Sequence, residues 1–197
     1  LALGASPGDY SKCFIMTADI SLAGQTYTTA IIAANSVFTG SFDGAGHTIT
    51  TLLINNDSGD YLGLFGQTGS GANIKKIKIV NCSIKADRYA GGIVGYNDGG
   101  IIDNCQASGQ ISGYYQSGGI VGYHKSGSLL NCYSTVFVAV DQEGGGIVGA
   151  NEGLVTNCEF NGNVTGVSWM VGGIAGSNNS TVSNCLSRGL IQGFTSC

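Results

Sequence analysis

The sequence predicts an all-β protein, a parallel β-helix with about 27 residues per coil. The pentapeptide Gly-Gly-Ile-Val-Gly begins at residues 91, 118 and 145, and the variant Gly-Gly-Ile-Ala-Gly begins at 172, so the interval is 27 residues each time. Short β-branched segments bounded by Gly, Asn, Asp and Ser fill each interval, without a run of ten or more residues at helical period. Glycine supplies 34 residues and proline only one, which suits closely spaced strands joined by tight turns.

The repeat length separates a β-helix from other repeat folds. Helical and leucine-rich repeats follow other consensus patterns, and a propeller blade needs about 40 residues. Three short strands in 27 residues fit one coil, stacked on the next at about 4.8 Å. A weaker copy of the motif begins at Leu62. We therefore expect five repeats of one continuous solenoid over residues 62–197.

Residues 1–61 are expected to form irregular coils that cap the solenoid, because terminal units of such arrays are atypical. Cys13–Leu22 reads as a strand, and Phe42–Ile49 reads as a turn followed by a strand. The other end shows no evident cap, since Cys197 stands just before the position at which the next Gly-Gly would start.

A second recurring element is the dipeptide Asn-Cys, which appears five times at steps of 23, 27, 26 and 27 residues. Residues at equal positions in a parallel coil lie over one another, so the pairs predict an asparagine column and a cysteine column. The ten residues are Asn81, Cys82, Asn104, Cys105, Asn131, Cys132, Asn157, Cys158, Asn184 and Cys185.

These motifs resemble the GLUG repeat, named after a Gly-Leu-hydrophobic-Gly tetrad that stands here as Gly63-Leu64-Phe65-Gly66 and recurs in Ile variants. The resemblance covers most of the chain, and Phe38–Ile54 also looks like the segment that precedes such arrays in large bacterial surface proteins. It implies a right-handed β-solenoid in secreted or surface-attached proteins, sometimes beside separate peptidase domains. The repeat itself carries no known catalytic residues, so the resemblance implies none here.

Composition argues against several kinds of partner. Charged residues make up 10% of the chain and the net charge is −4, so there is no basic field for nucleic acid. No stretch approaches the roughly 18 to 20 apolar residues that cross a bilayer. The Gly-Gly-x-Gly-x-Asp pattern of calcium-binding arrays is absent, and we expect no metal site and no cofactor.

The candidate catalytic groups do not converge. His47 reads as a turn or strand-edge residue, and His124 stands where other repeats carry Asn97, Asn151 and Asn178. Parallel β-helices can host polysaccharide chemistry on paired carboxylates, but the twelve acidic residues share no single repeat position. We therefore expect a protein that is not an enzyme.

Two further groups could contact a partner. The aromatic residues Tyr89, Tyr115, Trp169 and Phe194 each precede a Gly-Gly position or its expected continuation, and if stacked they would form a ribbon able to bind glycan or protein. Stabilisation of the turn by the same rings is the simpler interpretation. Cys13 and Cys197 lie outside the cysteine column and could form a disulfide or an interchain bond, since seven cysteines leave one thiol over.

The leading hypothesis is a non-enzymatic structural or adhesive β-solenoid module of a surface protein, located outside the cell. One alternative is a filament subunit that polymerises head to tail through its coil ends, because exposed strand edges recruit further strands. The other is a β-helix that binds or acts on polysaccharide.

Overall fold

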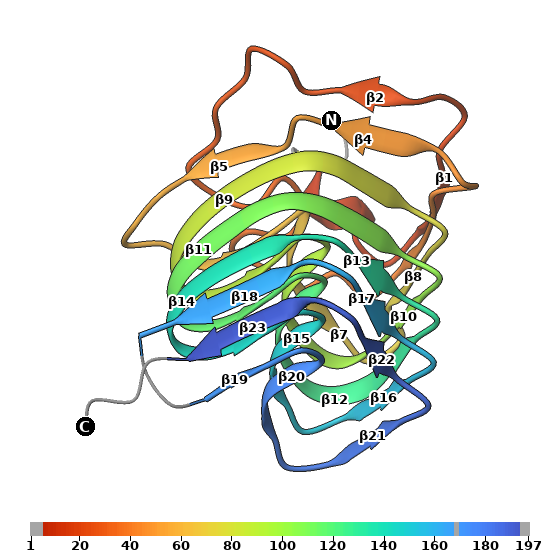
Figure 1. The fold of residues 1–197 in the computed structure, drawn as a ribbon. Coiled ribbons are helices and arrows are strands. Elements are labelled where there is room, and N and C mark those ends of the chain that lie inside the picture. Colours follow the sequence, from red (N-terminus) through yellow and green to blue (C-terminus); the bar gives the residue numbers. More distant parts are fainter. Residues whose placement is uncertain (1–5, 168–169, 194–197) are drawn as a thin grey trace.

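The computed structural model describes residues 6–167 and 170–193 and is nearly all β. After a short 3-10 helix at Pro7–Asp9, the chain winds through about seven turns of about 27 residues, which confirms the predicted parallel β-solenoid. Figure 1 shows the coils stacked along one axis, with the strands of successive coils lying above one another. Every strand pairing among the described residues is parallel, as stacked coils require.

Over the described residues, the first sheet has ten strands. They are β1 (Cys13–Ile15), β3 (Ser41–Asp43), β7 (Phe65–Gly69), β8 (Asn73–Lys75), β10 (Val94–Asp103), β12 (Val121–Leu130), β15 (Val148–Asn151), β16 (Leu154–Thr156), β20 (Ala175–Asn178) and β21 (Thr181–Ser183).

The second sheet has thirteen strands within residues 6–167 and 170–193. They are β2 (Ile20–Ser21), β4 (Thr48–Thr50), β5 (Leu53–Asn55), β6 (Asp60–Leu62), β9 (Lys78–Gly91), β11 (Gln106–Gly118), β13 (Tyr133–Ser134), β14 (Phe137–Gly145), β17 (Glu159–Phe160), β18 (Asn163–Gly166), β19 (Val171–Gly172), β22 (Leu186–Ser187) and β23 (Leu190–Gly193).

Where burial alternates along a strand, one set of side chains faces the core and the other set faces outward. In β14, Val138 and Val140 are buried, whereas Phe137 and Ala139 reach the surface. Equal inward positions then stack from coil to coil. One such column of the first sheet consists of Phe14, Phe42, Ile74, Ile102, Leu129, Val155 and Val182.

The Gly-Gly-Ile-Val-Gly motif forms a tight corner where backbones of adjacent coils touch. A Cβ atom on Gly122 would lie 2.5 Å from the backbone carbon of Tyr89, and one on Gly149 would lie 2.5 Å from that of Gln116. No side chain fits at such a distance. The Ile and Val between the glycines, Ile120 and Val121 for instance, are fully buried. The motif recurs because the corner needs glycine where the backbones of adjacent coils touch and aliphatic side chains in the core.

The N-terminal segment continues the same two sheets. Strand β3 pairs with both β1 and β8, and β4 pairs with both β2 and β9. Strand β6 crosses the predicted boundary after residue 61 and pairs with β9, so the solenoid runs through that boundary without a break. The segment predicted as one strand over Cys13–Leu22 is divided into β1 and β2. Within the described residues, no helix is long and apolar enough to cross a membrane.

Candidate functional site

The asparagine column forms, but with four members. Registers place Asp103, Leu130, Thr156 and Ser183 over one another, and the residue after each is Asn104, Asn131, Asn157 or Asn184. All four asparagines have φ between 51° and 55°, the left-handed conformation that asparagine tolerates better than most residues. Nδ2 of Asn157 donates to Oδ1 of Asn131 at 3.3 Å, and Nδ2 of Asn131 donates to Asp103 at 2.8 Å. The asparagine therefore belongs to a corner between the two sheets.

The inclusion of Asn81 and Cys82 in these columns was wrong. Cys82 pairs with Gly109, four positions beyond Cys105 in the next coil. The corner position of that coil is held by Lys76, which also has a left-handed φ of 53°. The corner tolerates lysine, so the dipeptide at residues 81 and 82 is a chance match at another bend. The irregular step of 23 residues was the sign of this displacement.

The cysteine column consists of Cys105, Cys132, Cys158 and Cys185, each with its thiol turned toward backbone carbonyl oxygens of its own coil and the preceding coil. All described cysteines carry free thiols. Burial raises the pKa of Cys132, and it raises that of Cys82 to about 12. Such thiols are poor nucleophiles and pack as small apolar groups. Cys13 is exposed and also free, and Cys197 lies outside the described residues.

A polar column inside the core contains His124. It lies between Asn97 and Asn151 in a column that runs from Thr68 to Asn178, as expected of a variant at one repeat position. The column is buried from Thr68 to Asn151, and Asn178 is exposed. Asn97 Oδ1 accepts from the Gly100 N–H, so its Nδ2 donates to His124 Nδ1 at 2.9 Å. His124 Nε2 then donates to the Leu154 carbonyl at 3.3 Å. The ring is fully buried, and desolvation lowers its pKa to about 4. His124 is thus a neutral core residue.

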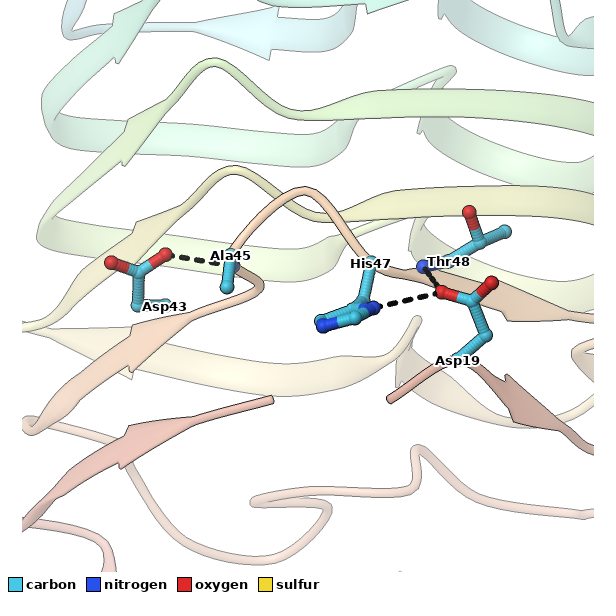
Figure 2. Close-up of polar contacts among 5 residues, drawn as sticks. All are labelled: Asp19, Asp43, Ala45, His47 and Thr48. Atoms are coloured by element: carbon cyan, nitrogen blue, oxygen red, sulfur yellow. Dashed lines mark hydrogen bonds and ion pairs between the residues drawn. The ribbon is translucent and has the colours of Figure 1, made fainter. Parts of the chain in front are cut away.

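His47 lies at the surface in a turn between β3 and β4. Figure 2 shows the Asp19 carboxylate accepting from the Thr48 N–H at 2.9 Å and contacting His47 Nδ1 at 3.1 Å. At the other end of the turn, Asp43 accepts from the Ala45 N–H at 2.8 Å. The Thr48 and His47 hydrogen bonds lower the pKa of Asp19, and the Ala45 hydrogen bond lowers that of Asp43. Both carboxylates hold the turn in place, in keeping with the predicted turn role of His47.

The predicted aromatic ribbon does not stack between its two described members. Tyr115 pairs with Arg88 and with Gln142, so it lies one position away from Tyr89 in the coil. The two tyrosines still share one small hollow with Arg88 and Gln116. Trp169 and Phe194 lie outside the described residues. The different distances of the two tyrosines from Gly-Gly explain the mismatch.

Another tyrosine cluster forms in place of that ribbon. Tyr61 stacks on Tyr89 with ring centroids 5.0 Å apart, and Tyr89 stacks on Tyr123 at 5.8 Å. Tyr96 meets all three rings edge to face. Each ring is partly covered by its neighbours, so the cluster packs the corner of three coils. Burial and a hydrogen bond to Glu152 raise the pKa of Tyr123.

A depression with two adjoining parts lies on the outer face of the second sheet. A hollow of about 400 Å³ crosses successive coils, and a second of about 210 Å³ adjoins it and shares Ser112 and Ala139 with it. We call the two together the outer groove. The first hollow is lined by Asp57, Ala86, Ser112, Gly113, Tyr114, Ala139, Val140, Asp141, Thr165, Gly166 and Val167. The second is lined by Ser83, Ile84, Lys85, Gln110, Ile111, Ser112, Phe137 and Ala139.

Sequence reasoning missed the outer groove because its residues do not repeat. The column Arg88, Tyr115 and Gln142 lies beside a column in which Asp87, Tyr114, Asp141 and Val167 follow one another. Three kinds of side chain, two aspartates, a tyrosine and a valine, share that position. The signal that could have indicated the groove is the alternation of apolar and polar residues along each strand, which shows which side chains face outward.

Comparisons with known proteins agree with this fold. The family model of the GLUG motif matches residues 86–112, which include one Gly-Gly-Ile-Val-Gly and one Asn-Cys. Halomucin of Haloquadratum walsbyi is 42% identical over 76 residues, which is 39% of this chain and 1% of halomucin. The chain thus spans a very small part of that relative.

A solved structure is similar over nearly the whole chain. The crystal structure of a Bacteroides ovatus protein, proposed to be an immunoglobulin A1 protease, aligns with a TM-score of 0.71 over 92% of this chain and 61% of that one. At 23% identity, the likeness concerns the fold alone. Together with the motif match, these observations establish that the chain carries the GLUG motif on a parallel β-solenoid.

Proposed function

We propose that the chain is a non-enzymatic scaffold module of a surface protein, an extracellular rod that presents its outer face for adhesion. The observation that carries the proposal is the use of the repeated residues. The glycines allow contact between backbones, the asparagines turn the corners, and the cysteines fill the core. The repeated residues therefore build the solenoid itself, and the outward side chains, which vary between repeats, are available to bind partners.

The absence of an enzymatic role is part of the proposal. One of the two histidines is buried and neutral in the polar column, and the other is held by Asp19 in a turn. In the described part of the chain, no three potential metal ligands from His, Cys, Asp and Glu lie close enough to hold an ion. The resemblance to GLUG-repeat surface proteins supports the extracellular location.

Location is tested with antibodies raised against the folded chain. They should label intact, unpermeabilised cells of the source organism, and labelling only after permeabilisation would refute an extracellular module.

The scaffold role is tested by removing one complete repeat, residues 118–144, which joins Ser117 to Gly145. Since both sides of the junction keep their register, this variant should remain folded and shorten by about 4.8 Å. Removal of residues 118–137 is the matched control, because it displaces every column and should prevent folding. Circular dichroism and small-angle scattering measure both. Unfolding after the in-phase deletion would contradict a modular scaffold.

A further inference from the structure

We infer that the outer groove binds an uncharged, linear polysaccharide that lies along the solenoid axis. The inference rests on the proposed adhesive function and gives it a ligand class. It starts from the direction of the groove. Ala86, Gly113, Val140 and Gly166 are consecutive partners in β9, β11, β14 and β18, so the floor passes from coil to coil. With Asp57 of the preceding coil, the groove spans four steps, about 19 Å.

The floor of the groove is flat, because Ala86 and Val140 are buried and the other floor residues carry little or no side chain. Gly113 and Gly166 contribute no side chain, and Ala139 contributes a methyl group. A flat backbone surface of this kind admits a ribbon-shaped polymer rather than a bulky side chain. Ser112 and Thr165 flank the floor with hydroxyl groups, each of which can both donate and accept hydrogen bonds.

Tyr114 provides an aromatic platform at the edge of the groove. Its side chain is 47% exposed, although tyrosine in this fold is otherwise mostly half-buried. The ring of Tyr115 supports it edge to face at 5.1 Å and 72°. A rigid, exposed ring suits the apolar face of a sugar, since aromatic rings gain most from flat apolar contact. Phe137, 40% exposed, offers a second ring in the adjoining hollow.

Polar groups in the groove complement hydroxyls rather than charges. Neither Asp57 nor Asp141 has an ion pair or hydrogen-bond partner among the described residues, so both carboxylates are free to accept from sugar hydroxyls. Lys85 is the single cation among the lining residues, and Gln110 adds an amide donor. Two free carboxylates disfavour an anionic polymer. The Lys85 ammonium, which would repel a second cation, disfavours a cationic peptide.

The test measures binding of the 197-residue chain to four probes: a neutral galactomannan, a neutral β-glucan, polygalacturonate and an oligolysine peptide. At least one neutral polysaccharide should bind, with an affinity that changes less than twofold between 0.05 and 0.5 M salt, because no charge is paired. Preference for polygalacturonate or oligolysine, or binding to none of the four probes, would overturn the inference.

Variants locate the binding. Tyr114→Ala should weaken it at least tenfold, whereas Tyr114→Phe, which keeps the ring, should remain within threefold of the wild type. Tyr133→Ala is the matched control, because Tyr133 is half-buried on β13 and lines neither hollow. Ala139→Tyr, which fills the floor from an outward position, should also abolish binding and does not depend on Tyr114→Ala folding. Undiminished binding by either Tyr114→Ala or Ala139→Tyr would refute the site. Surface labelling with antibodies is independent of these results, so failure of the groove leaves the proposed location standing.

Discussion

Lowering the pH should weaken the solenoid through His124. The pKa of the buried ring is about 4, against 6.5 for a free histidine. Between these values the unfolded chain binds a proton that the folded chain does not, so stability falls as the pH falls. The contribution is fully present above about pH 6.5 and is lost by about pH 4. The difference of about 2.5 units corresponds to about 3 kcal/mol at 1.36 kcal/mol per unit.

The structural cause of the low pKa is specific. Burial beside Asn97 and Gly153 is the main cause, and the carbonyl groups of Leu154 and Gly127, which favour the charged form, do not offset it. Protonation of Nδ1 would also place an N–H against the Asn97 amide donor. The histidine must therefore leave the core, or the coil must open, before it can take up a proton.

The assay compares urea unfolding at pH 7.0, 5.5 and 4.5 for the wild type and His124→Asn, with His47→Asn as the matched exposed control. Asparagine already occupies this column at positions 97, 151 and 178. His124→Asn should lose most of the dependence between pH 7.0 and 4.5, and His47→Asn should keep it. An NMR titration of the His124 ring should give a midpoint near 4. A midpoint at or above 6.5, or an unchanged slope in His124→Asn, would refute the reasoning.

Two further predictions concern the repeated residues. Gly149→Ala should destabilise the chain by about 2 to 3 kcal/mol, because the new Cβ would lie 2.5 Å from the Gln116 backbone carbon and 2.6 Å from the Gly122 oxygen. Gly8→Ala is the control. Nothing lies within 4 Å of its Cβ, so it should change stability by less than about 0.5 kcal/mol. Equal melting temperatures for the two variants would count against the tight corner. In a Cys197→Ser background, a thiol reagent should modify Cys13 rapidly and the buried Cys82, Cys105, Cys132 and Cys158 only on unfolding. Because Cys185 is half-buried, rapid modification of three or more thiols in the native chain would contradict the buried column.

The sequence predicted the architecture well because backbone geometry imposes the repeat. Gly118 and Gly145 must be glycine where adjacent backbones touch, and His124 was placed correctly because its neighbours in the repeat are asparagines. The failure at Asn81 has the same origin. A corner requires a left-handed residue rather than an asparagine as such, and Lys76 meets that requirement. Matching the Asn-Cys dipeptide by residue identity alone therefore assigned Asn81 to the wrong corner.

The candidate binding face was less predictable for a different reason. Outward side chains such as Tyr114 and Asp141 are not constrained by packing between coils, so they vary at one repeat position. Head-to-tail assembly, the other alternative raised by the sequence, stays a prediction.

The buried polar column has a consequence for folding accuracy. An aliphatic core alone could accept a coil that has slipped by two residues, because valine and isoleucine are interchangeable as neighbours. The Asn97 amide, in contrast, has fixed partners in Thr68, Gly100 and His124. A slipped coil would strand these dipoles away from water, at a cost of about 1 to 3 kcal/mol for each. The buried polar column therefore favours the native register of the coils over registers displaced by two residues.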